Sequence, residues 1–109
     1  MTDAATAAIA HEPRPADEVV AGTPSTAWAA LGATPAGDEV GVWEMTAGAM
    51  RDVEADEVFV VLSGRASVEL VDEGRTLELG PGSVGWLDAG TRTVWTVHET
   101  LRKVYITPA

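Results

Sequence analysis

From Glu39 onward, short runs rich in β-branched and aromatic residues follow one another along the chain. Turn-forming stretches such as Gly80-Pro81-Gly82 separate them. Strands of this length, with a turn signal every ~8–12 residues, are typical of a β-sandwich or β-barrel. No longer window has the periodicity of an amphipathic helix. The pattern predicts an all-β fold with strands in the runs EVGVWEMT, EVFVVLS, RASVELV, RTLEL, SVGWL, TVWTV and LRKVYI.

Some of these runs show which side chains share a face. Val68 and Leu70 alternate with Ser67 and Glu69, as expected of a strand with one buried face. The run 57–63 is instead apolar at nearly every position. That pattern predicts a strand buried on both faces.

The first third of the chain is less regular. Residues 1–18 are rich in Ala, Pro and charge and predict a disordered or loosely attached arm. Residues 19–109 then form the barrel domain, and Val19 and Val20 open its first strand. The segment 24–31 fits either one helical turn after a Thr23 or Ser25 cap or an irregular strap.

Composition narrows the classes of partner. A chain of 109 residues fits one domain. Asp and Glu number 17 against 7 Lys and Arg, giving a formal net charge of −10, so we expect neither nucleic-acid nor membrane binding. The absence of cysteine excludes disulfides, zinc–thiolate sites and thiol catalysis. We expect a cytoplasmic protein without a signal peptide, and a homodimer, because a small barrel gains buried area by pairing.

Two motifs give the chain a family resemblance. Gly48 and the segment Glu57-x6-Gly64 resemble the first cupin motif, G-x5-H-x-H-x3/4-E-x6-G, and residues 82–97 resemble the second, G-x5-P-x-G-x2-H-x3-N. The ordered pieces GVWEMTAG, DE, L-x-G and VWTVHETLRKVY are similar to small cupins related to ethanolamine-utilisation proteins and to (S)-ureidoglycine aminohydrolase. The resemblance implies a cupin (RmlC-like jelly-roll) antiparallel β-barrel that handles a small molecule.

The histidines that usually hold a cupin metal are missing, and Glu57 is the one ligand position that the chain retains. The first two histidine positions fall on Arg51 and Val53 or on Met50 and Asp52, depending on the spacer, and the third falls on Thr93. Imidazole is the usual ligand for Mn, Fe, Ni and Zn, so we expect no metal and no cofactor.

An oxygen-ligand site is the alternative for the acidic run. Strand alternation would place Asp52, Glu54 and Asp56 on one side and Glu57 on the other. A solvated acidic loop explains the same run of charge, and we favour the loop.

Glu57 is the candidate catalytic residue, because its motif position points into the barrel in cupins. A desolvated carboxylate takes up a proton nearer neutral pH and can then act as a general acid or base. A structural ion pair with Arg51 or Lys103 is the other interpretation of Glu57. The candidates for substrate binding are Arg51, which can hold a carboxylate, and Trp43, Trp86, Thr93 and Trp95 as pocket walls.

These residues support three functional hypotheses. The first is metal-independent acid–base chemistry (isomerase, dehydratase, cyclase or hydrolase type) on a small polar or carboxylated substrate. The second is a non-catalytic binding or sensing module that uses the same pocket. The third is a structural protein whose barrel is filled by tryptophan side chains. The aminohydrolase resemblance adds a metal-dependent enzyme as a further alternative.

Overall fold

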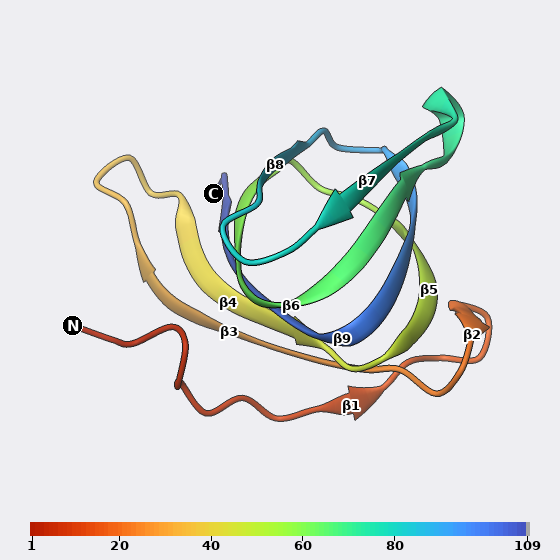
Figure 1. Cartoon of the computed structure of the whole chain (residues 1–109). Coiled ribbons are helices and arrows are strands. Elements are labelled where there is room, and N and C mark those ends of the chain that lie inside the picture. The colour runs from red at the N-terminus through yellow and green to blue at the C-terminus, as the bar shows by residue number, and fades with distance from the viewer. Residues whose placement is uncertain (109) are drawn as a thin grey trace.

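The computed structural model describes residues 1–108, and its regular secondary structure is almost entirely β-strand (Figure 1). A 3-10 turn, η1 (Val71–Glu73), is the exception. The strands are β1 (Glu12–Pro13), β2 (Val19–Ala21), β3 (Ser25–Ala33), β4 (Glu39–Met45), β5 (Gly48–Val53), β6 (Glu57–Leu70), β7 (Arg75–Leu79), β8 (Val84–Leu87) and β9 (Arg92–Thr107).

The long strand β9 organises the sheet. One of its edges pairs with β5 near its start and with β4 near its end. Its other edge pairs with β6 along almost its whole length, and the far edge of β6 carries β7 and β8. All pairs are antiparallel, and the sheet curls into a half-barrel (Figure 1). The all-β prediction is confirmed.

The concave face of this curled sheet carries the core. On β9 the odd-numbered positions 93–97 and 101–105 are buried, because alternate side chains of a strand point to one face. The same rule puts one side of β4, β5, β6 and β8 into the barrel. The apolar cluster comprises Met45, Met50, Phe59, Val61, Ala66, Val68, Leu79, Leu87, Trp95, Val97, Leu101 and Tyr105.

The apolar run 57–63 differs from its prediction. Phe59 and Val61 are buried, but Val58 and Val60, which alternate with them along the strand, are only half-buried. The strand therefore has one core face, because no second layer of the described chain covers the convex side of β6 there (Figure 1). The segment 24–31, for which the sequence left two interpretations, belongs to strand β3 from Ser25 onward.

Residues 1–18 make specific contacts with the convex side of the sheet. β1 pairs with β3, and this part of the chain runs along the outside of β3 (Figure 1). Arg102 donates from Nε to the carbonyl of Ala4 at 2.9 Å and from a terminal nitrogen to that of Ala7 at 2.5 Å. The division into an arm over 1–18 and a domain over 19–109 stays a prediction. Within residues 1–108, no helix has the length and apolar character to span a membrane.

Gly64, the last residue of the first cupin motif, has a clear packing role. Its φ of 91° lies in the left-handed region, and an added Cβ would stand 2.0 Å from the carbonyl oxygen of Thr100. β6 passes the bend of β9 at this point, where the register between the two strands shifts. Only glycine satisfies both constraints.

We predict that Gly64→Ala lowers the free energy of unfolding by about 2–5 kcal/mol, from left-handed strain and overpacking together. Gly74→Ala is the matched control: Gly74 is also left-handed, at φ 64°, but nothing lies within 4 Å of its added Cβ. That control should lose only about 1–2 kcal/mol. Urea unfolding measures both, and equal losses would contradict the packing role of Gly64.

Candidate functional site

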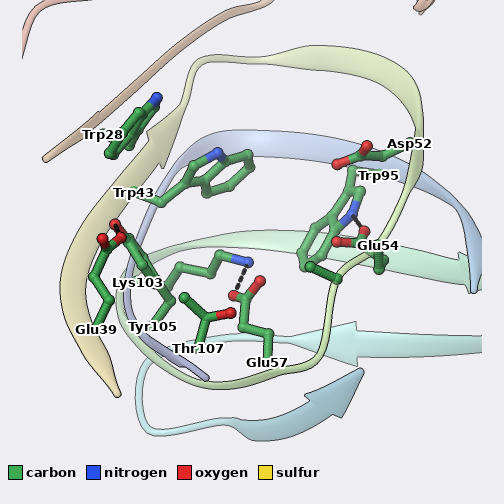
Figure 2. Close-up of a pocket in the computed structure, with 11 residues that line it drawn as sticks. Trp28, Glu39, Trp43, Asp52, Glu54, Glu57, Trp95, Lys103, Tyr105 and Thr107 are labelled. Carbon is green, nitrogen blue, oxygen red and sulfur yellow. Dashed lines mark hydrogen bonds and ion pairs between the residues drawn. The ribbon is translucent and has the colours of Figure 1, made fainter. Parts of the chain in front are cut away.

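A pocket of about 290 Å³ lies on the concave side of the curled sheet (Figure 2). Its walls come from β3, β4, β6 and β9 and from the end of β5 with the loop that follows it. Its acidic, aromatic and single basic side chains converge on one space. The lining residues are Trp28, Glu39, Trp43, Asp52, Glu54, Ala55, Glu57, Trp95, Lys103, Tyr105 and Thr107.

Lys103, the only lysine of the chain, is buried at the pocket with 4% of its surface exposed. Its ammonium nitrogen lies 4.7 Å from the ring centroid of Trp43 and 4.6 Å from those of Phe59 and Trp95. The same nitrogen is 2.8 Å from Oε1 of Glu57 (Figure 2). We call these three rings and the Glu57 carboxylate the ammonium cage.

Three strands build the ammonium cage. β4 supplies Trp43, β6 supplies Glu57 and Phe59, and β9 supplies Trp95 and the lysine itself. Aromatic faces attract a cation, and the attraction is stronger when the cation is desolvated. Oε1 of Glu57 is buried and has no hydrogen-bond partner within residues 1–108, despite the short distance. The Glu57 contact is therefore an ion pair held by charge rather than by hydrogen-bond geometry.

A second buried carboxylate, Glu54, is fully engaged. Its Oε2 accepts a hydrogen bond from Thr93 Oγ1 at 2.7 Å and another from Trp95 Nε1 at 2.9 Å. Thr93 stands where the third cupin histidine is usual, and here its hydroxyl fixes a carboxylate at the pocket wall. Trp95 satisfies its indole N–H in the same way, as a buried indole requires.

Asp52 is the carboxylate whose proton affinity departs most from the ordinary. Burial, followed by the charge of Glu54, raises the pKa of Asp52 from 3.8 to about 6. A hydrogen bond that Oδ1 accepts from the backbone N–H of Val53 at 2.8 Å opposes this rise. Asp52 can therefore take up or release a proton near neutral pH, as a general acid–base group must.

The sequence assigned the acidic run wrongly in one respect. Asp52, Glu54 and Glu57 all line the pocket, whereas Asp56 points away and accepts a hydrogen bond from the backbone N–H of Ala89. Strict alternation fails because β5 ends at Val53 and β6 begins only at Glu57. The intervening turn brings Glu57 to the same side as Asp52 and Glu54.

The positions that would ligate a cupin metal do not fit a metal ion. Asp52 lines the pocket and Met50 is in the core, so the four-residue spacer describes this barrel. Met50 offers only a thioether, Thr93 donates to Glu54, and the orphaned oxygen of Glu57 already faces an ammonium. A divalent cation beside that ammonium would be repelled. Within residues 1–108, no three His, Cys, Asp or Glu side chains are grouped to hold a metal ion.

Arg51 does not lie in this pocket, contrary to its predicted role. Its neighbours Met50 and Asp52 face the barrel, so Arg51 faces outward. Its guanidinium donates to the backbone carbonyl of Asp17 at 2.6 Å. It borders a second hollow near the end of β5, which Asp52 and Thr93 also border. The prediction for Arg51 assumed the three-residue spacer, and a shift of one residue exchanges the two faces of a strand.

Trp86 is also placed outside the pocket. It lies on the convex face of β8 with 72% of its surface exposed, whereas its neighbour Leu87 is in the core. Trp43 and Trp95, by contrast, do line the pocket. Their ring centroids are 5.7 Å apart at 50°.

Several pocket residues were not among the sequence candidates. Lys103 and Tyr105 follow from continuing the alternation of Thr93 and Trp95 along β9. Tyr105 donates its hydroxyl hydrogen bond to Glu39 Oε2 at 2.7 Å, and burial together with Glu39 raises the pKa of Tyr105. Trp28 pairs in register with Trp43 and forms the exposed rim. That rim depends on β3, which the sequence did not predict as a strand.

The family model of the EutQ-like cupin domain matches residues 34–105 of this chain. The chain belongs to the EutQ-like cupin family. The match spans β4 through most of β9, the strands that carry the ammonium cage. No curated protein matches this EutQ-like cupin.

Solved structures share the fold of this EutQ-like cupin at low identity. The EutQ protein of Clostridium difficile is 20% identical with a TM-score of 0.66, over 79% of this chain and 64% of that one. A protein of unknown function from Rhizobium leguminosarum is 25% identical with a TM-score of 0.66, over 77% and 82%. A DUF861-family protein from Pseudomonas syringae reaches a TM-score of 0.76 at 21% identity, over 92% of this chain but 44% of that one.

We predict that Asp52→Asn stabilises the EutQ-like cupin more at pH 8 than at pH 4. A raised pKa means that the folded protein holds the Asp52 proton more tightly than the unfolded chain between about pH 4 and pH 6. Stability therefore falls as the pH rises through this window and stays lower above it. The asparagine is neutral throughout and keeps an acceptor for the Val53 N–H.

Urea unfolding of both proteins at the two pH values measures this difference. Asp88→Asn, on an exposed turn, is the control and should show no such pH dependence. Equal effects of Asp52→Asn at pH 4 and pH 8 would contradict the raised pKa.

Proposed function

We propose that this cupin carries out metal-independent acid–base chemistry on a small polar molecule bound in the pocket. The observation that carries the proposal is Asp52, a carboxylate with a pKa of about 6 that lines a pocket beside a buried ammonium. A group that titrates near the working pH combines the right protonation state with a useful driving force for proton transfer. The reaction is an isomerisation, dehydration, cyclisation or hydrolysis.

The proposal changes the role of Glu57. The sequence offered it as the general acid or base, with a structural pair to Lys103 as the alternative interpretation. The 2.8 Å approach to the lysine ammonium supports the pair. We assign proton transfer to Asp52 and assign Glu57 to holding Lys103, while its carboxylate still borders the ligand space.

The charges of the pocket also narrow the substrate. Four carboxylates and one ammonium line it, from Glu39, Asp52, Glu54, Glu57 and Lys103. A carboxylated substrate would meet this excess of negative charge, and Arg51 does not line the pocket to anchor it. We therefore propose a neutral or cationic polar substrate, with Trp28, Trp43 and Trp95 as the apolar walls.

A non-catalytic binding module is the second candidate, and one observation favours it. Glu39, Glu54 and Glu57 each have a side-chain partner within the protein. Among the described pocket residues, this leaves Asp52 without a second unpaired carboxylate to act as the opposite acid or base. A barrel filled entirely by tryptophan is disfavoured, since about 290 Å³ remains open.

We also propose that the cupin is a homodimer joined through its convex face. Support comes from apolar side chains that neighbour one another there: Val58 is in register with Trp86 on one side and with Ile106 on the other, and Val60 with Val84. Val84, Trp86 and Ile106 are exposed in the single chain, and contiguous apolar surface is typical of an interface. Light scattering of the purified protein tests this association.

A thermal-melt screen with small amines, amides, polyols and carboxylates tests the pocket. Neutral or cationic compounds should stabilise the protein, by about 2.7 kcal/mol at 100 times the dissociation constant, and carboxylates should not. Trp28→Ala should weaken the response at least about tenfold, since a lost aromatic wall removes one or more kcal/mol of contact. Val20→Ala is the control, because Val20 is an exposed apolar side chain that does not line the pocket, and it should leave the response unchanged.

Asp52→Asn separates the two candidate functions. For an enzyme, this variant should still bind the compound found by the screen but lose turnover by about 10²-fold or more. Turnover that survives in Asp52→Asn would exclude Asp52 as the acid–base group. If a carboxylate compound stabilises the protein and Arg51→Ala abolishes that stabilisation, the ligand binds instead in the second hollow near the end of β5.

A further inference from the structure

The floor of the pocket carries a positive charge that the protein itself provides. Lysine is almost never fully buried unless it is paired, yet the only lysine of this chain is 4% exposed. Its nitrogen approaches three aromatic centroids to within 4.6–4.7 Å. An arrangement of several aromatic faces and a carboxylate around one ammonium is the way in which proteins bind free organic cations.

The groups around the Lys103 nitrogen are those that attract a cation. Each ring face is attracted to the cation and gains nothing comparable from a neutral amine. The Glu57 carboxylate at 2.8 Å acts in the same direction. The geometry thus places the Lys103 ammonium as the ion-pair partner of Glu57 and as the cation of the three rings.

The Lys103 ammonium lies at the position where a cupin metal would be expected, next to Glu57. Glu57 is the one ligand position that the cupin motif retains here, and its carboxylate faces the ammonium instead of a metal ion. Of the other ligand positions, Met50 lies in the core and Thr93 donates to Glu54, whereas Asp52 lines the pocket. The negative charge that would have balanced a metal is balanced by Lys103.

We propose that the Lys103 ammonium takes the electrostatic place of a metal ion in this barrel and presents a fixed positive charge to an oxygen atom of the bound ligand. The cage itself is a property of the protein alone, and its action on a ligand rests on the proposed function. In that reaction the Asp52 carboxylate takes a proton from the ligand. The electron pair left behind stays on the ligand, where the ammonium stabilises the negative charge, until Asp52 returns the proton.

Chemical rescue tests the cage without any substrate. Lys103→Ala removes three methylene groups and the ammonium, which together correspond to n-propylammonium. We expect the melting temperature of Lys103→Ala to rise saturably with n-propylammonium chloride and to respond at least about tenfold more weakly to n-propanol, which lacks the charge. The wild-type protein, with its cage filled, should show no such rise. Arg75→Ala is the control, since Arg75 forms an exposed ion pair with Glu73.

Two results would contradict the presence of a resident cation at this site. One is an equal response of Lys103→Ala to n-propanol and n-propylammonium, which would make the site an apolar hole. The other is a wild-type response to Mn, Ni or Zn that EDTA reverses and Glu57→Gln abolishes, which would restore Glu57 as a metal ligand.

Lys103→Met and a labelling experiment cover the case in which Lys103→Ala does not fold. In the folded wild type, Lys103 should react with an amine-directed reagent at least about tenfold more slowly than in urea, because a caged side chain reacts only from opened states. Lys103 labelled as fast in the folded protein as in urea would overturn the cage.

The effect of the Lys103 ammonium on a bound ligand is tested separately. Lys103→Met should lose at least about tenfold in affinity or turnover for the compound found by the thermal screen, since a buried charge interaction is removed. Full affinity and turnover in Lys103→Met would refute the electrostatic role. If n-propylammonium rescues Lys103→Ala but no compound in the screen stabilises the wild-type protein, the ammonium cage is supported and the proposed function is contradicted.

Discussion

The buried ion pair between Lys103 and Glu57 is the constraint around which the interior of this cupin is arranged. Two charges removed from water are costly unless each finds compensation within the protein. Here the carboxylate lies 2.8 Å from the ammonium, and three aromatic ring centroids lie within 4.6–4.7 Å of the ammonium nitrogen. Those rings come from β4, β6 and β9, so the pair also fixes how these three strands meet at the pocket.

The remaining pocket residues follow from this arrangement. Trp95 turns one face to the ammonium and its N–H to Glu54, which also receives the Thr93 hydroxyl. The charge on Glu54 then contributes to the raised pKa of Asp52. The side chains at the former ligand positions thus have different roles: Met50 packs in the core, Thr93 donates to Glu54, Glu57 pairs with Lys103, and Asp52 lines the ligand space.

The sequence predicted the fold well because alternation and turn residues are local signals. Strand faces were predicted where the run was regular, so Trp95 lines the pocket as expected, whereas Thr93, expected there too, is buried without lining it. Predictions failed where one residue of register was in question. Arg51 was assigned with the wrong motif spacer, and the turn between β5 and β6 broke the alternation assumed for the run from Asp52 to Glu57. The cage itself needed tertiary information, because Trp43, Phe59 and Lys103 are distant in sequence and meet only through the curl of the sheet.

Selective labelling with ¹³C,¹⁵N-lysine tests the resident cation most directly, since Lys103 is the only lysine and gives a single set of side-chain signals. The account predicts that the Cε protons are shifted upfield by the ring currents of three aromatic neighbours, and that the ammonium protons exchange slowly with water. Both features should be lost in Trp95→Ala if that variant remains folded. A lysine signal at the position of a free side chain, with rapid exchange in the native protein, would contradict the account.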